Sequence, residues 1–232
     1  MAQAPDILAR RWTLLVIREL LSGSHHFNDL HRGVPRMSRS LLVRRLNELE
    51  EAGLVERRLV GADDHPEYHL TQAGEELQPI IFQLGSWGKR WVQREVSREE
   101  LDAGLLMWDM QRRIVRDRLP PQRIVVYFQF TDAPKEHQHF WLILEQDEVD
   151  LCLKDPGGEE DLYVRSDVRT LTDVWLGDIS LTRALKEESL WLGGSPSLRR
   201  SFPDWLGLSM FAGIARQPRG KVQAFRPRVT SA

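Results

Sequence analysis

Apolar residues recur with helical spacing between Ser38 and Gly53. Leu42, Leu46 and Leu49 are separated by four and then three positions, which places them on one side of a helix. Serine is favoured at the start of a helix, and glycine is favoured just past its end. The segment therefore predicts a helix with one buried side.

The opposite side of this predicted helix is polar and cationic. Ser40, Arg44 and Asn47 point away from the leucines, and Arg39 and Val43 flank them. Arginine can bond guanine and asparagine can bond adenine in the major groove of DNA. The first half of such a helix is the part that reaches the bases. An ordinary amphipathic surface helix has the same buried stripe, so the flanking segments must decide between the two interpretations.

The segments before this helix complete a motif. A strongly amphipathic helix is predicted over residues 7–21, and a short helix begins at Phe27 and ends before Pro35. A short helix, a tight turn and a longer helix form a helix-turn-helix. The turn contributes Arg36, and Ser38 caps the longer helix. These segments favour the DNA-binding interpretation.

The segments after it predict a wing and an outer helix. Residues 54–60 and 67–71 resemble short strands, and the Gly, Asp and Pro residues between them indicate a hairpin. We expect Arg57 and His65 of this hairpin to reach DNA. Thr71 then begins a helix that extends to Trp91.

The second half of the chain has a different pattern of apolar and polar residues from the first. A helix is predicted over 104–119, followed by strands and two further helices, which indicates an α+β fold with a mostly antiparallel sheet. Val149, Leu151 and Leu153 share one face of the third strand. The predicted strands are 123–131, 139–146, 148–155, 161–164 and 190–194, and the two helices are 170–175 and 179–190. We expect three parts: a winged helix-turn-helix domain (1–95), an α+β domain (102–215) and a disordered basic tail (216–232).

The charge pattern agrees with a DNA-binding first half. The formal net charge is −2, but residues 96–215 carry 14 Lys and Arg against 21 Asp and Glu, whereas residues 1–95 carry 13 of each. Residues 30–47 contain no acidic side chain. Attraction to phosphates depends on such a local patch rather than on the total charge. The basic residues of this stretch are Arg32, Arg36, Arg39, Arg44 and Arg45.

Four ordered blocks carry a resemblance to a known family. RWTLLVIRELLSG, FNDL, MSRSLLVRRLNELEEAGLVERR and EYHLTQAGEELQPII resemble the HxlR family of bacterial winged helix-turn-helix regulators over about residues 7 to 92. The resemblance implies a homodimer that pairs through its outer helices, with Trp12, Trp87 and Trp91 at the interface. It also implies double-stranded DNA as the partner. The expected DNA-binding residues are Arg36, Ser38, Arg39, Ser40, Val43, Arg44, Asn47, Arg57 and His65.

Cysteine usage departs from that family. Its oxidant-sensing members use a cysteine just before the first helix, and this chain begins closer to that helix with no cysteine in residues 1–95. Composition therefore excludes a thiol switch at that position. Cys152 is the single cysteine, and strand alternation predicts that it is half-buried. One cysteine, no secretory signal and no long apolar run predict a cytoplasmic protein without a membrane span.

A second resemblance covers residues 124–213. The segment DVWLGDISLTRALKEESLWLGG resembles the sterol-carrier-protein type of lipid-binding domain, which implies helices and a sheet enclosing an apolar pocket for a lipid-like or aromatic ligand. Large rings gather in this half, although each ring alone is more readily explained as core. The expected pocket residues are Trp108, Phe128, Phe130, Phe140, Trp141, Trp175 and Trp205.

Motifs of enzymes and metal sites are missing from the sequence. It has no nucleophile elbow, phosphate-binding glycine loop or dinucleotide fingerprint. The pairs His25–His26 and His137–His139 lack the further ligands of a metal site and are expected in solvated loops. We therefore expect no enzyme, cofactor or metal. Two alternatives to a ligand-modulated regulator stay open: a constitutive regulator with a purely structural second domain, and a lipid-binding or interaction protein whose winged helix does not read DNA.

Overall fold

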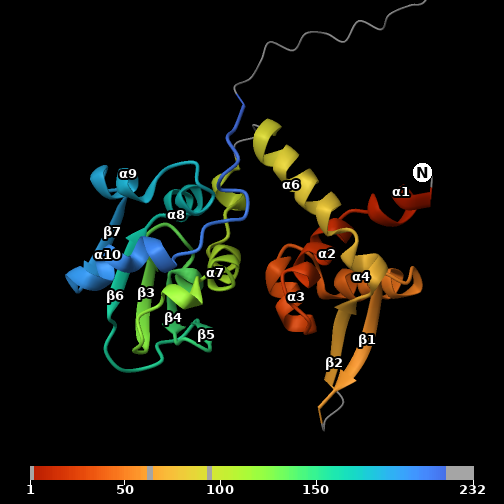
Figure 1. The fold of residues 1–232 in the computed structure, drawn as a ribbon, viewed down its shortest axis with the longest axis horizontal. Helices are drawn as coiled ribbons and strands as arrows, with labels where there is room; N and C mark the ends of the chain where they lie inside the picture. The colour runs from red at the N-terminus through yellow and green to blue at the C-terminus, as the bar shows by residue number, and fades with distance from the viewer. Residues whose placement is uncertain (1–2, 62–64, 93–95, 218–232) are drawn as a thin grey trace, which may run out of the picture.

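Two separate clusters of buried apolar side chains organise the fold. Figure 1 shows the two units that contain them. A computed structural model describes residues 3–61, 65–92 and 96–217. The first cluster draws its residues from positions 16–68 and the second from positions 103–206. Within the described ranges, no helix is long and apolar enough to cross a membrane.

The first unit contains the helix-turn-helix and the wing. Leu42, Leu46 and Leu49 are each 0% exposed and pack against Val16 and Leu30, as the spacing predicts. The elements are α1 (Gln3–Leu8), α2 (Thr13–Leu21), α3 (Phe27–Gly33), α4 (Arg39–Glu51), β1 (Val55–Val60), β2 (His65–Leu70), α5 (Gln72–Glu75) and α6 (Gln78–Trp91).

The first predicted helix is broken. Residues 7–21 do not form one helix, because the chain turns between α1 and α2 and Trp12 takes a left-handed conformation with φ 78°. Helix α4 holds this turn: Arg45 Nε donates to the carbonyl of Arg11 at 3.1 Å, and Arg10 pairs with Glu48 at 2.9 Å. A contact between segments that are distant in sequence thus overrides the helical periodicity.

The outer helix is also divided. The predicted helix from Thr71 to Trp91 consists of α5 and α6. Pro79 explains the division, because it has no N–H to bond the carbonyl of Glu75 and its ring crowds that carbonyl. Thr71 caps α5 as expected, its hydroxyl accepting from the N–H of Gly74 at 3.3 Å.

The second unit is a five-stranded sheet with helices on one face. Its strand order is β5-β4-β3-β6-β7; β3 and β6 are parallel and the other pairs are antiparallel. The sequence predicts this mostly antiparallel α+β architecture. The elements are η1 (Arg98–Glu100), α7 (Ala103–Gln111), η2 (Arg116–Arg118), β3 (Ile124–Phe130), η3 (Lys135–His137), β4 (His139–Leu144), β5 (Val149–Cys152), β6 (Leu162–Ser166), α8 (Val168–Trp175), α9 (Leu181–Lys186), β7 (Leu190–Gly194) and α10 (Pro196–Trp205).

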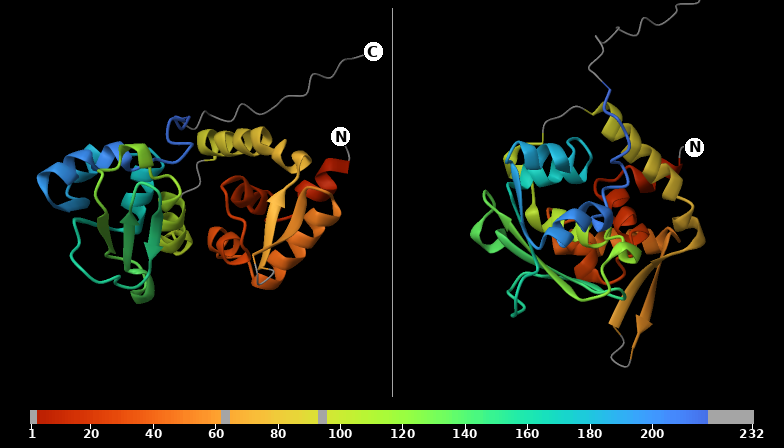
Figure 2. Two further views of the ribbon diagram at one scale, coloured as in Figure 1. Left: turned by 60° about the horizontal axis from the view of Figure 1, so that its bottom comes forward. Right: turned by 60° about the vertical axis from the view of Figure 1, so that its left-hand side comes forward.

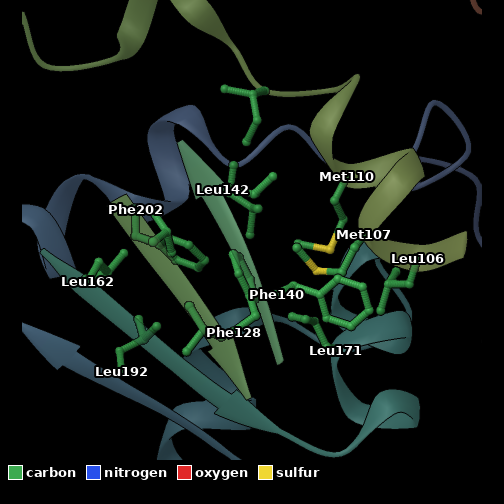
Figure 3. Packing of buried hydrophobic residues seen from close by; sticks show 14 of the residues in the cluster. Leu106, Met107, Met110, Phe128, Phe140, Leu142, Leu162, Leu171, Leu192 and Phe202 are labelled. Carbon is green, nitrogen blue, oxygen red and sulfur yellow. The ribbon is translucent and has the colours of Figure 1, made fainter. Parts of the chain in front are cut away.

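Strand alternation decides which side of the sheet is covered. Phe128 of β3 and Phe140 of β4 point toward Met107 of α7, Leu171 of α8 and Phe202 of α10 (Figure 3). The other face carries polar and aromatic side chains, including Tyr127, Tyr163 and Arg165. One face of the sheet therefore forms the core of the second unit.

Several predicted bounds in this unit are wrong. The helix predicted over 104–119 ends at Gln111, and Val115, which lies within the predicted range, is 37% exposed. The helix predicted over 179–190 is only α9, since Glu188 adopts a left-handed φ of 56° before β7. Leu153, placed with Val149 on a strand face, lies beyond the end of β5 and is exposed.

Helix α10 was not predicted at all. Its signals were present, because Ser195 caps it by accepting from the N–H of Leu198 and proline occupies its first turn. Leu198, Phe202 and Trp205 are buried at spacings of four and three. Pro203 lies inside this periodic segment, and because proline disfavours a helix interior, the sequence did not predict a helix there.

The two units meet through buried charge. Arg112 Nη1 of α7 bonds Glu19 Oε2 of α2 at 2.9 Å and Ser24 Oγ at 3.2 Å. Glu19 is 0% exposed and also pairs with Arg18 at 2.6 Å. Burial raises the pKa of Asp109, which pairs with the other end of Arg112.

A C-terminal strap, residues 206–217, joins the second unit to α6. Figures 1 and 2 show this segment (blue) passing beside the C-terminal end of α6 (yellow). Phe211 stacks on Phe82 at 5.7 Å between ring centroids, and the N–H of Gln217 donates to the carbonyl of Arg90 at 2.9 Å. The basic tail was predicted from residue 216, but Arg216 is held by Asp178 at 2.8 Å. Residues 218–232 of that predicted tail lie outside the described residues.

Candidate nucleic-acid interface

The turn between α3 and α4 is rigidly packed. Val34 and Met37 are buried in the first core, and His31 Nε2 donates to the carbonyl of Met37 at 2.9 Å. Ser38 caps α4, its hydroxyl accepting from the N–H of Leu41 at 3.3 Å. These contacts set the direction in which α4 leaves the turn.

The predicted DNA-facing residues of α4 share one exposed surface. Ser40, Val43, Arg44 and Asn47 are all exposed, and the side chain of Arg44 is 74% exposed. The leucine stripe lies on the opposite side and anchors the helix to the core. The helix thus presents two hydrogen-bonding side chains, from Arg44 and Asn47, on a fixed backbone.

Arg39 is held at the start of α3. Its Nη2 donates to Asn28 Oδ1 at 2.9 Å, and its guanidinium lies 4.8 Å from the centre of the Phe27 ring. The side chain is exposed at the first position of α4. This arrangement keeps a positive charge beside the N-terminal end of the helix, where an anion is favoured.

Glu48 gathers arginines at the other end of that surface. It pairs with Arg10 at 2.9 Å, with Arg44 at 3.5 Å and with Arg45. Desolvation alone would raise the pKa of Glu48, but hydrogen bonds from Arg45 and Arg10 lower it below its ordinary value. Arg10 and Glu48 were not predicted as parts of the site, although the three-residue spacing of Arg45 and Glu48 was a usable signal.

Arg36 has a partner in the second unit. Its side chain is 60% exposed and lies 3.8 Å from Glu100 of η1. The sequence placed Arg36 in an acid-free stretch, but an acid from a distant segment approaches it in the fold. The cation is exposed at the turn and is also positioned by the second unit.

The wing is a regular two-stranded hairpin. Strands β1 and β2 pair antiparallel, with Arg57 opposite Tyr68. Arg57 and His65 are both exposed. The tip, residues 62–64, lies outside the described residues. The hairpin root is fixed to the core, because Tyr68 is buried and its N–H donates to the carbonyl of His25 at 2.9 Å.

The two histidine pairs have structural roles. His25 is half-buried and stacks on His69 at 4.2 Å, whereas His26 is exposed, as expected of a solvated loop, and lies 3.5 Å from Glu67. His139 begins β4 and its Nδ1 lies 2.6 Å from the Tyr127 hydroxyl. In the described part of the chain, no group of three or more His, Cys, Asp or Glu side chains could hold a metal ion.

Helix α6 carries an apolar surface that the single chain leaves open. Trp87 is 56% and Trp91 53% exposed, and Ile80, Phe82 and Leu84 are also exposed. Trp12, predicted to join them at an interface, is half-buried and packs against the first core; its place at an interface stays a prediction.

Comparisons with known proteins agree with this geometry. The HxlR-like helix-turn-helix family matches residues 7–96. The HTH-type transcriptional regulator YvaP of Bacillus subtilis (strain 168) is 36% identical over 91 residues, which cover 39% of this chain and 84% of YvaP. The chain belongs to the HxlR-like helix-turn-helix family. YkvN of the same organism, also an HTH-type transcriptional regulator, is 31% identical over 98 residues, covering 42% of this chain and 83% of YkvN.

Solved structures add a similar comparison. The reduced form of the transcriptional regulator YodB from B. subtilis is 31% identical, covering 38% of this HxlR-like chain and 88% of YodB, with a TM-score of 0.36. The sec-alkylsulfatase Pisa1 from Pseudomonas sp. aligns with 48% of this chain and 17% of its own, at 17% identity and a TM-score of 0.40. That likeness carries no argument about function. YvaP and YkvN, the HxlR-like relatives, are both named as HTH-type transcriptional regulators.

The aromatic residues expected around a ligand are dispersed outside the HxlR-like part of the chain. Phe128, Phe130 and Trp205 are at most 1% exposed and fill the core. Trp141 lies on the opposite sheet face beside Tyr127, and Trp175 packs at the edge of the core. Trp108 and Phe140 line a cavity between α3 and α7.

Proposed function

We propose that this HxlR-like protein regulates transcription by binding double-stranded DNA as a homodimer through α4 and the wing. The observation that carries the proposal is the exposed surface of Ser40, Arg44 and Asn47 on a helix whose other side is fully buried. A side chain can discriminate between bases only when its backbone is held in place, and the leucine stripe of α4 supplies that support.

The contacts divide by role. Arg44 and Asn47 meet base edges in the major groove, together with Ser40 and Val43. Arg36, Ser38 and Arg39 lie at the turn, where phosphates are contacted and orientation is set. Arg57 and His65 extend the contact through the wing.

The proposed dimer pairs through α6. Ile80, Leu84, Trp87 and Trp91 leave a large apolar surface on this helix, and exposed apolar patches of that kind mark interaction sites. A twofold dimer would place two recognition helices about 34 Å apart, which is one turn of DNA. The operator is then an inverted repeat.

The second domain, residues 102–215, is proposed as a sensor resembling the sterol-carrier-protein type, modulated by an apolar or aromatic ligand. The side chains of Phe128, Phe130 and Trp205 fill the core of the second unit instead of lining a pocket. A constitutive regulator with a purely structural second domain is the alternative to this proposal. A lipid-binding protein that does not read DNA is the less favoured alternative, because Arg44 and Asn47 are exposed on a rigid helix.

A selection of genomic DNA fragments by the purified full-length protein tests the proposal. We expect enrichment of one inverted-repeat sequence, with half-sites about ten base pairs apart centre to centre. The double variant Arg44→Ala, Asn47→Ala should lose this enrichment. The control Arg183→Ala, an exposed arginine in α9, should keep it. Equal recovery of all sequences by the unmodified protein would refute operator reading.

A further inference from the structure

A cavity of about 230 Å³ lies where the two units meet. Its walls come from both: Arg32 and Pro35 belong to the helix-turn-helix, and Trp108, Phe140 and Leu151 belong to the second unit. We name it the α3–α7 cavity. It differs from the apolar pocket implied by the sterol-carrier-protein resemblance, because its walls come from both units rather than from the second unit alone.

The walls combine rings with positive charge. The indole of Trp108 and the ring of Phe140 form an apolar surface, and the polar residues Arg32, His31 and His137 also line the cavity. The guanidinium of Arg32 lies 5.4 Å from the centre of the Trp108 ring. Arg32 also bonds Asp29 at 3.0 Å, which leaves other N–H groups of its five for a ligand.

One acid lines the α3–α7 cavity. Asp102 Oδ1 accepts from the N–H of Leu105 at 3.0 Å and caps α7, so this carboxylate already has a partner. The charged wall group that remains is Arg32, which only donates hydrogen bonds. The Nε2 of His31 is already bonded to the carbonyl of Met37. The wall therefore favours an anionic or hydrogen-bond-accepting group over a cation.

Two polar atoms in the wall residues lack partners. The indole Nε1 of Trp108 and Oε1 of Gln111 are buried without a hydrogen bond to the described residues. The Gln111 amide is oriented by its own donor, since Nε2 bonds the carbonyl of Val149 at 2.6 Å. Buried polar groups are rarely left unpaired in native proteins. A ligand with an acceptor for the indole N–H of Trp108 and a hydroxyl donor for Oε1 of Gln111 would pair both atoms.

We propose that the α3–α7 cavity binds a small aromatic carboxylate and is the effector site of this regulator. The volume suits one ring or two fused rings, because it lies below the range for drug-sized ligands. This inference rests on the proposed function, since it names the ligand class and the place where that ligand acts.

The α3–α7 cavity is adjacent to the DNA-binding turn. His31 of its wall bonds the carbonyl of Met37, and the next residue, Ser38, caps α4. A ligand in this cavity that bonds Arg32 and packs beside Trp108 contacts both units at once. A ligand that prefers one arrangement of the two units over another changes the affinity for DNA when these arrangements also differ in DNA binding. Bound DNA then changes the affinity for the ligand by the same factor.

Calorimetric titration of the full-length, DNA-free protein tests the site. We use benzoate and 4-hydroxybenzoate as probes and benzamide as the neutral comparison. Saturable binding of one carboxylate per chain is expected, with benzamide weaker by about tenfold because a charge-assisted hydrogen bond is lost. Arg32→Gln should weaken benzoate binding by about tenfold and leave benzamide unchanged.

A filling variant locates the site. Leu153 lines the cavity and is exposed at its border, so Leu153→Trp should abolish carboxylate binding without unfolding the protein. Leu208→Trp, a substitution at another exposed leucine, is the matched control and should bind normally. Absence of saturable binding, unchanged binding by Leu153→Trp, or equal binding of benzamide overturns the proposal. Operator binding by the unmodified protein is measured separately. Carboxylate binding without operator binding would refute the proposed regulator. Operator binding without carboxylate binding would refute only the effector site.

Discussion

At the residue scale, the proposed base reading depends most on Arg44. It is exposed on the recognition surface and contacts Glu48 at 3.5 Å, so it is oriented along the helix without being buried. Arg44→Ala should weaken operator binding by about 1–3 kcal/mol and relax the base preference at one position. Fluorescence anisotropy against operator and random duplexes measures both effects. Arg36→Ala is the comparison, and it should weaken both duplexes equally. An equal loss on both duplexes for Arg44→Ala would contradict base reading.

Glu19 gives a second prediction at this scale. It is fully buried and bonded to Arg18 and Arg112, and Gly33 leaves room for its carboxylate. Glu19→Ala should lower the free energy of unfolding by about 3–5 kcal/mol, because two arginines lose a buried partner. Glu187→Ala breaks the exposed pair with Arg183 and should cost about 0–1 kcal/mol. Urea denaturation compares them, and similar midpoints would show that the buried cluster contributes little.

At the element scale, α6 is the helix that the single chain leaves incompletely packed. No residue of α6 is buried, although the helix has 14 residues and a strongly apolar side. A helix of this composition is stabilised by burying its apolar face. Phe211 of the strap covers only the part near Phe82 and Gly85, which leaves Trp87 and Trp91 for a second copy.

The double variant Trp87→Arg, Trp91→Arg should therefore be monomeric. Two charges in an apolar interface cannot be paired across a twofold axis and would repel each other. Sedimentation velocity at micromolar concentration measures the assembly. Trp191→Arg changes a tryptophan of β7 with the same 56% exposure as Trp87 and should remain dimeric. If the unmodified protein is already a monomer, pairing through α6 is wrong.

At the scale of the whole molecule, Asp178 joins three segments. It bonds Lys89 of α6 at 2.6 Å and Arg216 of the strap at 2.8 Å, while belonging to the loop after α8. Burial by itself would raise the pKa of Asp178, but hydrogen bonds from Arg216 and Lys89 lower it below its ordinary value. The carboxylate therefore adds stability above its unfolded pKa, and that contribution is lost as pH falls through the folded pKa.

Asp178→Asn should loosen α6 from the second unit at neutral pH. Hydrogen exchange is expected to increase in the last turn of α6 and in residues 206–217, because the two cations lose their shared partner. Asp204→Asn, at another position of the second unit, is the control and should leave this exchange unchanged. The difference should vanish at strongly acidic pH, where Asp178 is protonated. Unchanged protection in α6 at neutral pH would show that the other strap contacts, such as the Phe211–Phe82 stack and the Gln217–Arg90 hydrogen bond, hold the strap without Asp178.

The sequence by itself determined the local elements of the first unit and the class of the second. Ser38, Gly53 and the three leucines predicted α4 because helical capping and periodicity are properties of a few neighbouring residues. The same locality explains the mistakes. Residues 7–21 have unbroken periodicity, but contacts from α4 to Arg10 and Arg11 divide them. Pro203 masked α10, whose packing against the sheet outweighs one missing hydrogen bond.

Only the tertiary structure decided which distant residues meet. Glu19 and Arg112 are 93 positions apart, and neither carries a local signal of the other. The rings expected around one pocket lie in different places for the same reason. Strand alternation places Phe128 and Phe130 in the core, whereas α7 places Trp108 against Arg32 at the boundary between the units. Periodicity specifies which side of a helix or strand is apolar. It does not specify which other element that side packs against, because the local sequence fits several partners equally well. The packing of the whole chain selects one of them.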